Sequence, residues 1–414
     1  MTMAGSRGRR VAYIMSRFPK LTETFILYEI LALESAGVDV EIFPLLREHE
    51  EVLHPEAARL VDRAQYQPFL SASILGSQLR MLARHPIRYL TTFASLLWAN
   101  RGSRNHFTGA LGIFPKTVHN ALVMRRMAID HVHCHFATHP AAAGWIIHRL
   151  TGITYSFTAH GSDIHVDRTG LCPKVADAAF VAAISEFNRQ VILDECGPQL
   201  ASTVEVLHSG VDTDHFRPQE RPRATDGRLH ILCIGTMHEV KGQAYLLEAC
   251  ARLQPDGIDF VCRLVGDGPD EPMLRATADR LGIGDRVVFE GRRTRDEIAE
   301  LLAASDVLVT PSVPASDGKR EGIPVVLMEA MSSGVAVVAS RLTGIPELVR
   351  HGETGLLADP RDVEGIAEAL RRLHADPALR SRLAAAGRSL VQRAFDIRRN
   401  AATLVARLER VAAA

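Results

Sequence analysis

Residues 317–334 read DGKREGIPVVLMEAMSSG, and this stretch decides how the rest of the chain is interpreted. A turn rich in Ser, Pro, Asp and Gly leads into Pro324, whose fixed φ and missing N–H suit the first position of a helix. We therefore predict a helix that begins at Pro324. Its free N–H groups and the positive end of its dipole would favour a bound phosphate or diphosphate.

Two glutamates flank this helix start. Glu321 lies just before it and Glu329 lies inside it, with seven residues between them. Glu321 can reach a group bound beyond the helix tip, whereas Glu329 can point beside that group towards hydroxyls. One anion and two sets of hydroxyls describe a sugar nucleotide. The alternative is that Glu329 forms a surface ion pair and Glu321 only favours the helix N-terminus.

The same stretch resembles the paired-glutamate signature of retaining glycosyltransferases of the family-four type. The Gly-Ile-Pro-Glu at residues 344–347 belongs to this resemblance, which extends over nearly the whole chain. It implies an α/β fold with two Rossmann-like domains that face each other across a cleft, the GT-B arrangement. It also implies hexosyl transfer with retention, no cofactor beyond the nucleotide-diphosphate sugar as co-substrate, and no metal.

Length and composition agree with a globular protein of two domains. The chain has 414 residues, 47% of them hydrophobic, and its zero net charge gives no sign of a nucleic-acid partner. Six cysteines without a Cys-x-x-Cys pair indicate neither a disulfide framework nor a zinc ribbon, so a reducing compartment is expected. No apolar run reaches membrane-spanning length. The expected location is the cytoplasm, with the inner face of the cell membrane as a candidate surface.

Alternating strand and helix patterns divide the chain in two. An amino-terminal, acceptor-side domain is expected over residues 1–216 and a nucleotide-sugar-binding domain over residues 229–395, with a polar linker between them. The resemblance implies that a terminal helix, residues 396–414, crosses back to the first domain.

Residues 63–129 form a basic helical insertion in the first domain that contains no Asp or Glu. Its nine cations face no anion within the insertion and alternate with apolar residues, often at helical spacing. Two interpretations stay open. Basic amphipathic helices lie on anionic membranes, whereas an ordinary helical subdomain packs its apolar residues inward. The cations are Arg63, Arg80, Arg84, Arg88, Arg101, Arg104, Lys116, Arg125 and Arg126.

Three segments of the first domain carry candidate residues. The first strand-to-helix turn, with Phe18, Thr22, Glu23 and Thr24, resembles the subgroup that builds bacterial exopolysaccharides of the colanic-acid type and is expected on the acceptor side. Residues 130–136, DHVHCHF, line up His131, His133 and His135 on one strand face. Zinc is the alternative there, but no carboxylate or Cys cluster completes a site.

A His-Gly-Ser-Asp run at residues 160–163 follows a β-rich segment. In a parallel sheet this is the edge that binds ligands. The resemblance implies that His160 contacts the donor sugar as a catalytic residue, and that Asp163 either holds the loop or touches the acceptor.

Donor-binding residues are expected in the second domain. The turn after the strand 229–234 keeps Lys241 and Gly242, which the resemblance places on the diphosphate, but Thr236 stands where arginine is usual. Arg292 and Arg293 are candidate replacements, and the turn at Gly266 is expected near the base. The remaining donor-binding candidates are Glu321, Gly322, Ile323, Pro324, Val325, Val326 and Glu329, of which Glu321 is also a catalytic candidate together with His160 and Lys241.

The prediction is a retaining glycosyltransferase of polysaccharide biosynthesis that moves a sugar from a nucleotide-sugar donor to a glycan or polyprenyl-linked acceptor. Neither glutamate is assigned as a nucleophile, because the resemblance implies same-face attack by the acceptor. Two alternatives remain: a nucleotide-sugar epimerase or hydrolase, and a non-catalytic nucleotide-sugar-binding protein of the same assembly. The missing arginine at Thr236 favours the latter.

Overall fold

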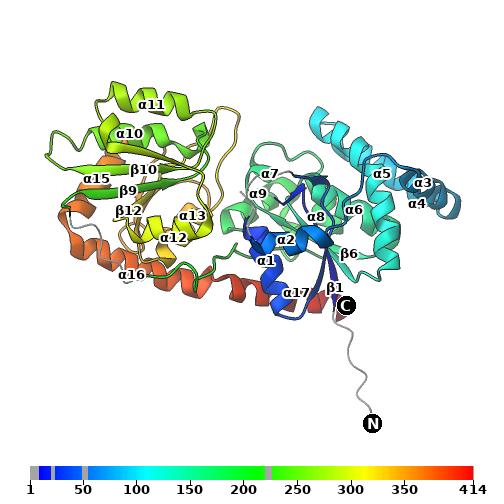
Figure 1. The fold of residues 1–414 in the computed structure, drawn as a ribbon. Helices are drawn as coiled ribbons and strands as arrows, with labels where there is room; N and C mark the ends of the chain where they lie inside the picture. Colours follow the sequence, from blue (N-terminus) through cyan, green and yellow to red (C-terminus); the bar gives the residue numbers. More distant parts are fainter. Residues whose placement is uncertain (1–8, 20–23, 49–54, 220–225, 414) are drawn as a thin grey trace, which may run out of the picture. The chain divides into compact units, whose positions relative to one another are not determined.

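A computed structural model describes residues 9–19, 24–48, 55–219 and 226–413, and Figure 1 shows its elements. It divides into two α/β units, Met1–Leu207 with Ala401–Ala414, and His208–Asn400. The first unit therefore ends before residue 216, the boundary expected from the sequence. The reason is local: Val211 exchanges backbone hydrogen bonds with Phe395 and Ile397, and Phe216 packs in the core of the second unit.

The first unit is built on a parallel six-stranded sheet of order β3-β1-β5-β6-β7-β8. Alternate residues of β1 enter different cores: Val11 and Tyr13 pack with α1 and α17, while Ala12 and Ile14 pack towards α5 and α6. The sheet is therefore covered on both faces, as parallel sheets require. Its strands are β1 (Arg10–Ile14), β3 (Asp39–Ile42), β5 (His131–His135), β6 (Thr154–Ala159), β7 (Phe180–Ala183) and β8 (Val204–Val206).

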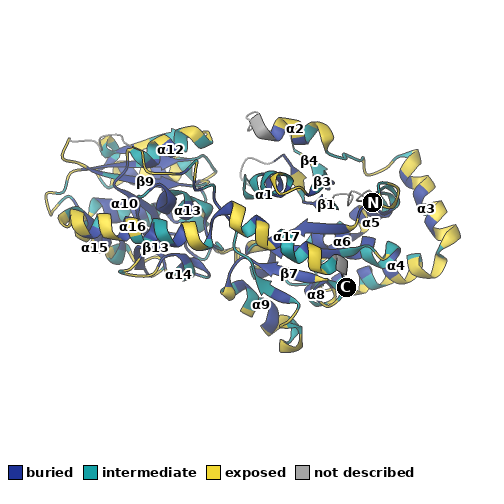
Figure 2. Ribbon diagram, turned by 90° about the horizontal axis from the view of Figure 1, so that it is seen from below, coloured by how far each residue is buried: buried dark blue, intermediate teal, exposed yellow. Residues whose placement is uncertain are grey.

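Helices surround this sheet, and a short parallel pair, β2 (Arg17–Phe18) with β4 (Leu46–Arg47), lies apart from it. The predicted helical insertion contains α3, α4 and α5, and Figure 2 shows many exposed residues on α3 and α4. The helices of the unit are α1 (Thr24–Ser35), α2 (Pro55–Arg63), α3 (Ala72–Arg84), α4 (Pro86–Asn100), α5 (Arg104–Arg126), α6 (His139–Thr151), α7 (Ser162–His165), α8 (Leu171–Asp177), α9 (Glu186–Cys196) and, from Ala401 onward, α17 (Ile397–Ala413).

Two cations of the insertion have partners that the sequence pattern did not predict. Arg63 pairs with Glu34 of α1, so an anion does face it. Lys116 is buried on α5 and donates to the Leu45 carbonyl, and burial lowers its pKa to about 8. The sequence pattern missed both contacts because the partners lie outside the insertion.

The second unit repeats the plan with a parallel sheet of order β11-β10-β9-β12-β13-β14. Its strands are β9 (Leu229–Ile234), β10 (Phe260–Val265), β11 (Val287–Gly291), β12 (Val307–Thr310), β13 (Ala336–Ser340) and β14 (Leu356–Ala358). Its helices include α10 (Gln243–Ala251), α11 (Glu271–Arg280), α12 (Arg295–Ala303), α13 (Val325–Ser332), α14 (Ile345–Leu348), α15 (Val363–Ala375) and α16 (Pro377–Ala394).

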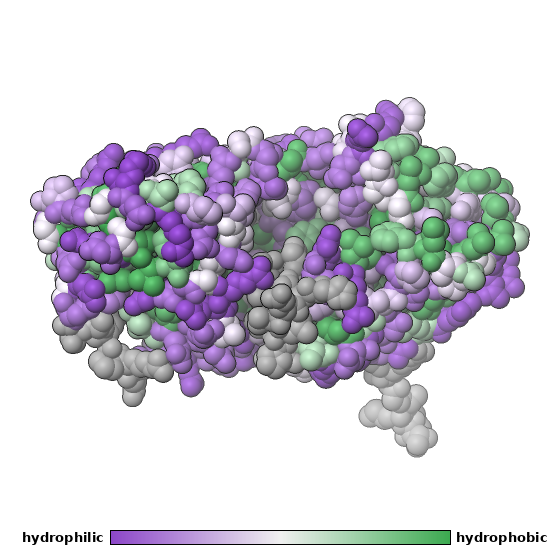
Figure 3. Space-filling model, turned by 45° about the horizontal axis from the view of Figure 1, so that its top comes forward, coloured by the Kyte–Doolittle hydropathy of each residue, from purple (hydrophilic) through white to green (hydrophobic). Residues whose placement is uncertain are grey.

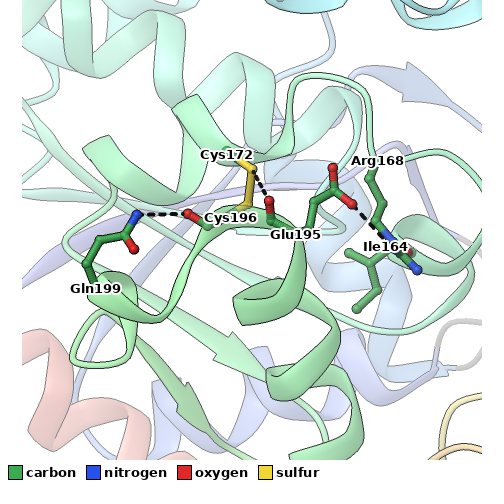
Figure 4. Close-up of a disulfide and its surroundings, with 6 residues drawn as sticks. All are labelled: Ile164, Arg168, Cys172, Glu195, Cys196 and Gln199. Atoms are coloured by element: carbon green, nitrogen blue, oxygen red, sulfur yellow. Dashed lines mark hydrogen bonds and ion pairs between the residues drawn. A yellow bond between two sulfur atoms is a disulfide. The ribbon is translucent and has the colours of Figure 1, made fainter.

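The expectation that the cysteines form no disulfide was wrong. Cys172 of α8 is bonded to Cys196 at the end of α9, although 24 residues separate them (Figure 4). Arg168 lies beside the bridge, where it donates to the Ile164 carbonyl and pairs with Glu195. Spacing rules detect cysteines that are close in sequence, whereas α8 and α9 meet only in the fold. The bridge removes the basis on which a reducing compartment was expected.

Among the residues that the structure describes, no helix combines the length and apolar character needed to cross a membrane.

Candidate functional site

The loop before α13 and the start of that helix form the centre of the candidate site in the second unit. Pro324 has φ −63° and ψ 129°, which is extended, so the helix begins at Val325 and not at Pro324 as predicted. The amides of Val325 and Val326 have no backbone acceptor among the described residues. They remain available to an anion, as first-turn amides of a helix usually are.

Glu321 is held in place from two sides. Its carboxylate accepts from Lys241 Nζ at 2.6 Å and from Ser312 Oγ at 3.0 Å. The Thr343 hydroxyl donates to the Glu321 and Gly322 carbonyls. The structure thus brings together two predicted residues, Lys241 after β9 and Glu321 in the loop between β12 and α13. Ser312 of the same loop and Thr343 after β13 were not predicted.

Two glycines allow backbone segments to approach closely at this edge of the sheet. Gly242 has φ 69°, and a Cβ there would lie 2.0 Å from the Pro311 carbonyl oxygen. Gly266, at the end of β10 with φ 120°, would place a Cβ 2.4 Å from the Gly235 oxygen. Only glycine fits either position without moving backbone.

Glu329 lies on α13, partly buried, and its carboxyl has no hydrogen-bond partner among the described residues. Burial raises its pKa to about 7, an effect that the charge of Arg295 partly offsets. Enclosed polar groups without partners are uncommon in native proteins, and carboxyls with perturbed pKa values cluster at functional sites. Glu329 is therefore a candidate to contact a hydroxyl of a ligand.

The raised pKa of Glu329 predicts a pH-dependent stability. Because the folded-state pKa, about 7, exceeds the ordinary value of 4.5, the protonated carboxyl favours the folded state. That contribution is complete below pH 4.5 and is lost as the pH rises through 7. Relative to Glu329→Gln, the wild-type free energy of unfolding should fall by at most about 3 kcal/mol across this window.

Urea denaturation of both proteins between pH 4 and pH 8 measures this difference. Glu353→Gln, at an exposed position of the same unit, is the control that should follow the wild type. Parallel pH profiles for wild type and Glu329→Gln would contradict the prediction.

Arg292 and Arg293, the candidate replacements for the missing arginine, form ion pairs with other side chains. Thr236 is exposed and offers its carbonyl to Gln243. Arg292 pairs with Asp267, and Arg293 pairs with Glu290. The cation whose charge reaches Glu329 is Arg295, which the sequence did not single out.

Arg295 opens α12 and is mostly buried. It donates to Asp212 at 3.0 Å and lies over the Phe216 ring at 5.3 Å. These partners lie about 80 positions upstream, so no local sequence signal could have revealed the cluster.

In the first unit, His160 and Asp163 follow β6, at the carboxyl edge of the sheet. The Asp163 carboxylate accepts from the backbone amides of Ala137 at 2.7 Å, Gly161 at 2.6 Å and His160 at 3.0 Å. Of the two roles considered for Asp163, loop holding is the one its contacts explain. It ties the loop after β5, where Phe136 has φ 79°, to the loop after β6.

We predict that Asp163→Ala destabilises the first unit, because three buried amides would lose their acceptor. The expected loss is about 3 kcal/mol in the free energy of unfolding, measured by chemical denaturation. Asp163→Asn, which keeps one acceptor oxygen, should lose less. Asp194→Ala, at an exposed position of α9, serves as the control. Equal stabilities of Asp163→Ala and this control would refute the loop-holding role.

The three histidines of β5 share one face, as predicted. His131 and His133 bond to the hydroxyls of Thr154, Ser156 and Thr158 on β6. The expectation that no carboxylate approaches them was wrong: potential ligand atoms of Glu29, His133 and His135 lie within 4.8 Å of one another.

Hydrogen bonds nevertheless account for this cluster. Both ring nitrogens of His133 already contact Ser156 and Thr158, and burial lowers the pKa of His133 to about 3. Glu29 belongs to α1 and reaches the cluster only through the fold, which is why the sequence pattern around the histidines did not reveal it.

The predicted acceptor-side residues are placed only in part. Phe18 ends β2 and is buried, and Thr24 begins α1. Thr22 and Glu23 lie outside the described residues.

With this geometry established, comparison with known proteins assigns the second unit. Residues 228–376 match the family model described as "Glycosyl transferases group 1". This segment is therefore similar to group 1 glycosyl transferases. It contains the strands β9 to β14 and the paired glutamates, so the sequence signature and the family match fall on the same residues.

Among curated proteins, the chain is 38% identical over 168 residues to the "Putative colanic acid biosynthesis glycosyltransferase WcaL" of Escherichia coli, covering 40% of this chain and 41% of that protein. It is 33% identical over 248 residues to the "GDP-mannose-dependent alpha-(1-6)-phosphatidylinositol monomannoside mannosyltransferase" of Mycolicibacterium smegmatis, covering 58% and 64%. The matches therefore span less than two thirds of these relatives. The predicted resemblance to glycosyltransferases of the colanic-acid type is confirmed.

Among solved structures, Anabaena Alr3699/HepE in complex with UDP superposes with a TM-score of 0.73 at 18% identity, covering 97% of this chain and 99% of that one. At this identity the likeness concerns the fold. It confirms the predicted class, α/β with two Rossmann-like domains as in GT-B proteins.

Proposed function

We propose that the protein is a retaining glycosyltransferase of exopolysaccharide or cell-surface polysaccharide biosynthesis. It transfers a hexosyl group from a nucleotide-diphosphate sugar to a glycan or polyprenyl-linked acceptor, without a metal or further cofactor. The observation that carries the proposal is the cluster of Lys241, Glu321 and the open amides of α13, with the partnerless Glu329 on the same helix. The group 1 family match of this unit and the names of the curated relatives support the same activity.

The site suits charge stabilisation more than covalent chemistry. As the bond between sugar and diphosphate breaks, negative charge grows on the leaving phosphate. Lys241 and the amides of Val325 and Val326 would stabilise it, and removing one such donor commonly costs about 3 kcal/mol. Glu321 would hold sugar hydroxyls and Glu329 the ribose. His160, from the first unit, would contact the donor sugar.

The first experiment is a thermal-shift screen with UDP-, GDP- and ADP-sugars. A donor at a hundred times its Kd should stabilise the protein by about 2.7 kcal/mol. The series of nucleotide sugars that stabilises the protein identifies the nucleotide base of the donor. Lys241→Ala and Glu329→Ala should both lose the shift. Lys319→Ala, an exposed lysine of the same loop that pairs with Asp317, should keep it.

Activity assays with the donor that stabilises the protein, with and without acceptor, separate the alternatives. Donor binding with no transfer to any polyprenyl-linked acceptor would favour a non-catalytic binding protein, which Thr236 in place of the usual arginine supports. Release of free nucleotide or an altered sugar without acceptor would favour a hydrolase or epimerase. No stabilisation by any nucleotide sugar would overturn the proposed donor site.

We further propose that helices α3 and α4 rest on an anionic membrane surface, where a polyprenyl-linked acceptor would be presented. Nine of the twelve large apolar side chains that are exposed in the described residues lie between residues 69 and 111. Leu70, Ile87 and Trp98 are 84%, 76% and 68% exposed. Figure 3 shows hydrophobic residues gathered on the side of the molecule that carries these helices. The full set is Phe69, Leu70, Leu75, Leu79, Leu82, Ile87, Leu90, Trp98 and Leu111.

The positive charge of this helical surface favours binding to anionic lipids. Arg80, Arg84 and Arg88 are exposed on the same helices, and residues 64–129 contain no Asp or Glu. Each cation near an anionic surface contributes about 1 kcal/mol. Part of the insertion does pack inward, with Ile74 and Met81 buried, so the outward apolar residues are additional to a complete core.

Liposome co-sedimentation tests this surface. The protein should bind phosphatidylserine vesicles more tightly than phosphatidylcholine vesicles, and added salt should weaken binding. The double variant Ile87→Glu with Trp98→Glu should abolish it, whereas Met273→Glu, an exposed apolar residue of the second unit, should not.

Equal binding to phosphatidylserine and phosphatidylcholine vesicles would contradict the proposal. A second result would also contradict the proposal: the protein self-associates without binding lipid, and the double variant removes this self-association. The apolar face would then bind a second copy of the chain.

A further inference from the structure

A carboxylate and two imidazoles lie in series below the carboxyl edge of the first sheet. Glu29 of α1 contacts His135 Nε2 at 3.1 Å through its Oε1 atom, and His135 Nδ1 contacts His160 Nε2 at 3.0 Å. His135 is completely buried, and both its ring nitrogens are used in these two contacts. His160 is partly exposed, and its Nδ1 has no hydrogen-bond partner among the described residues.

The protons in this series can be assigned from its two ends. The Glu29 carboxylate is a pure acceptor when ionised, and the Tyr13 hydroxyl donates to the same oxygen at 2.7 Å. Burial opposes ionisation of Glu29, whereas its hydrogen bonds to His135 and Tyr13 lower its pKa and favour the carboxylate. Glu29 therefore requires His135 to carry its proton on Nε2.

A neutral imidazole has one N–H and one bare nitrogen. With its proton on Nε2, His135 presents a bare Nδ1 to His160. The contact at 3.0 Å is then a hydrogen bond only if His160 carries its own proton on Nε2. The remaining Nδ1 of His160 is left bare, as an acceptor. Burial, and then the neighbouring His135, hold the pKa of His160 well below its ordinary value, which keeps the ring neutral.

We propose that Glu29 is a positioning residue that acts through His135 to fix His160 in the Nε2–H tautomer, so that its bare Nδ1 accepts a hydrogen bond from a hydroxyl of the bound sugar. The inference rests on the proposed contact between His160 and the donor sugar and names the group that this contact recognises: a hydroxyl as donor, not a phosphate or carboxylate oxygen.

Aromatic packing holds the His160 ring in the required orientation. Its ring centroid lies 4.7 Å from that of Phe25 and 4.7 Å from that of Phe136, and it stacks on His135 at 5.2 Å. Phe25 and Glu29 are four residues apart on α1 and so share one helix face. One helix thus supplies both the packing of the ring and the carboxylate that sets its proton.

Long-range proton–nitrogen NMR of histidine-labelled protein at pH 8 reads the tautomer directly. The signals of His160 are identified by their loss in His160→Gln. In the wild type we expect a protonated Nε2 and a bare Nδ1. A protonated Nδ1 would overturn the proposal, because His135 would then donate in the opposite direction.

Variants of Glu29 test the source of the tautomer. Glu29→Leu removes the acceptor and should move His160 towards the Nδ1–H form, with transfer reduced by about tenfold to a hundredfold, as when an outer partner of a functional histidine is lost. Glu29→Gln can accept from His135 through its amide oxygen and should restore the tautomer and most of the rate. Glu34→Gln, on the same helix but paired with Arg59 and Arg63, is the matched control.

The two kinds of failure are distinguishable. If the wild type transfers no sugar, the proposed function fails while the tautomer measurement still stands. If transfer occurs and Glu29→Leu changes neither the His160 signals nor the rate, Glu29 has no positioning role. Loss of rate in Glu29→Leu with an unchanged tautomer would reduce Glu29 to a structural residue and would also overturn the inference.

Discussion

Parallel strand pairing is the constraint on which both units depend. Because all strands of a parallel sheet end at the same edge, the loops that follow them converge there, however far apart they are in sequence. In the first unit this brings the loops after β5 and β6 together, so that Asp163 accepts an amide of Ala137. In the second unit it brings Lys241, which follows β9, to Glu321, which precedes α13.

The cost of burying polar groups separates structural positions from candidate binding positions at these edges. The β5 histidines are fully buried, yet each ring nitrogen has a hydroxyl, carboxylate or imidazole partner, so the cluster is stable as it stands. Glu329 differs: it is partly buried and has no hydrogen bond to the described residues, and burial raises its pKa. A group left in that state favours a ligand that supplies the missing donors.

The sequence predicted what depends on local pattern. The strand β9 was recognised residue for residue from its apolar run, and α13 was displaced by one position because Pro324 adopts an extended ψ. Contacts between distant segments could not be predicted. The Cys172–Cys196 bond is one example, and the approach of Glu29 to His135, 106 residues away, is another.

The ion pair between Lys241 and Glu321 gives the proposed reaction a further physical consequence. Without donor, each charge neutralises the other at 2.6 Å, and Ser312 satisfies the second carboxylate oxygen, so neither charge is left unpaired in a partly buried site. A diphosphate carries more negative charge than one carboxylate and would draw the ammonium group towards it. Glu321 would then lose a partner as the sugar arrives, and sugar hydroxyls are the donors that can replace it. Cation and carboxylate would thus exchange partners together, which couples recognition of the phosphate to recognition of the sugar.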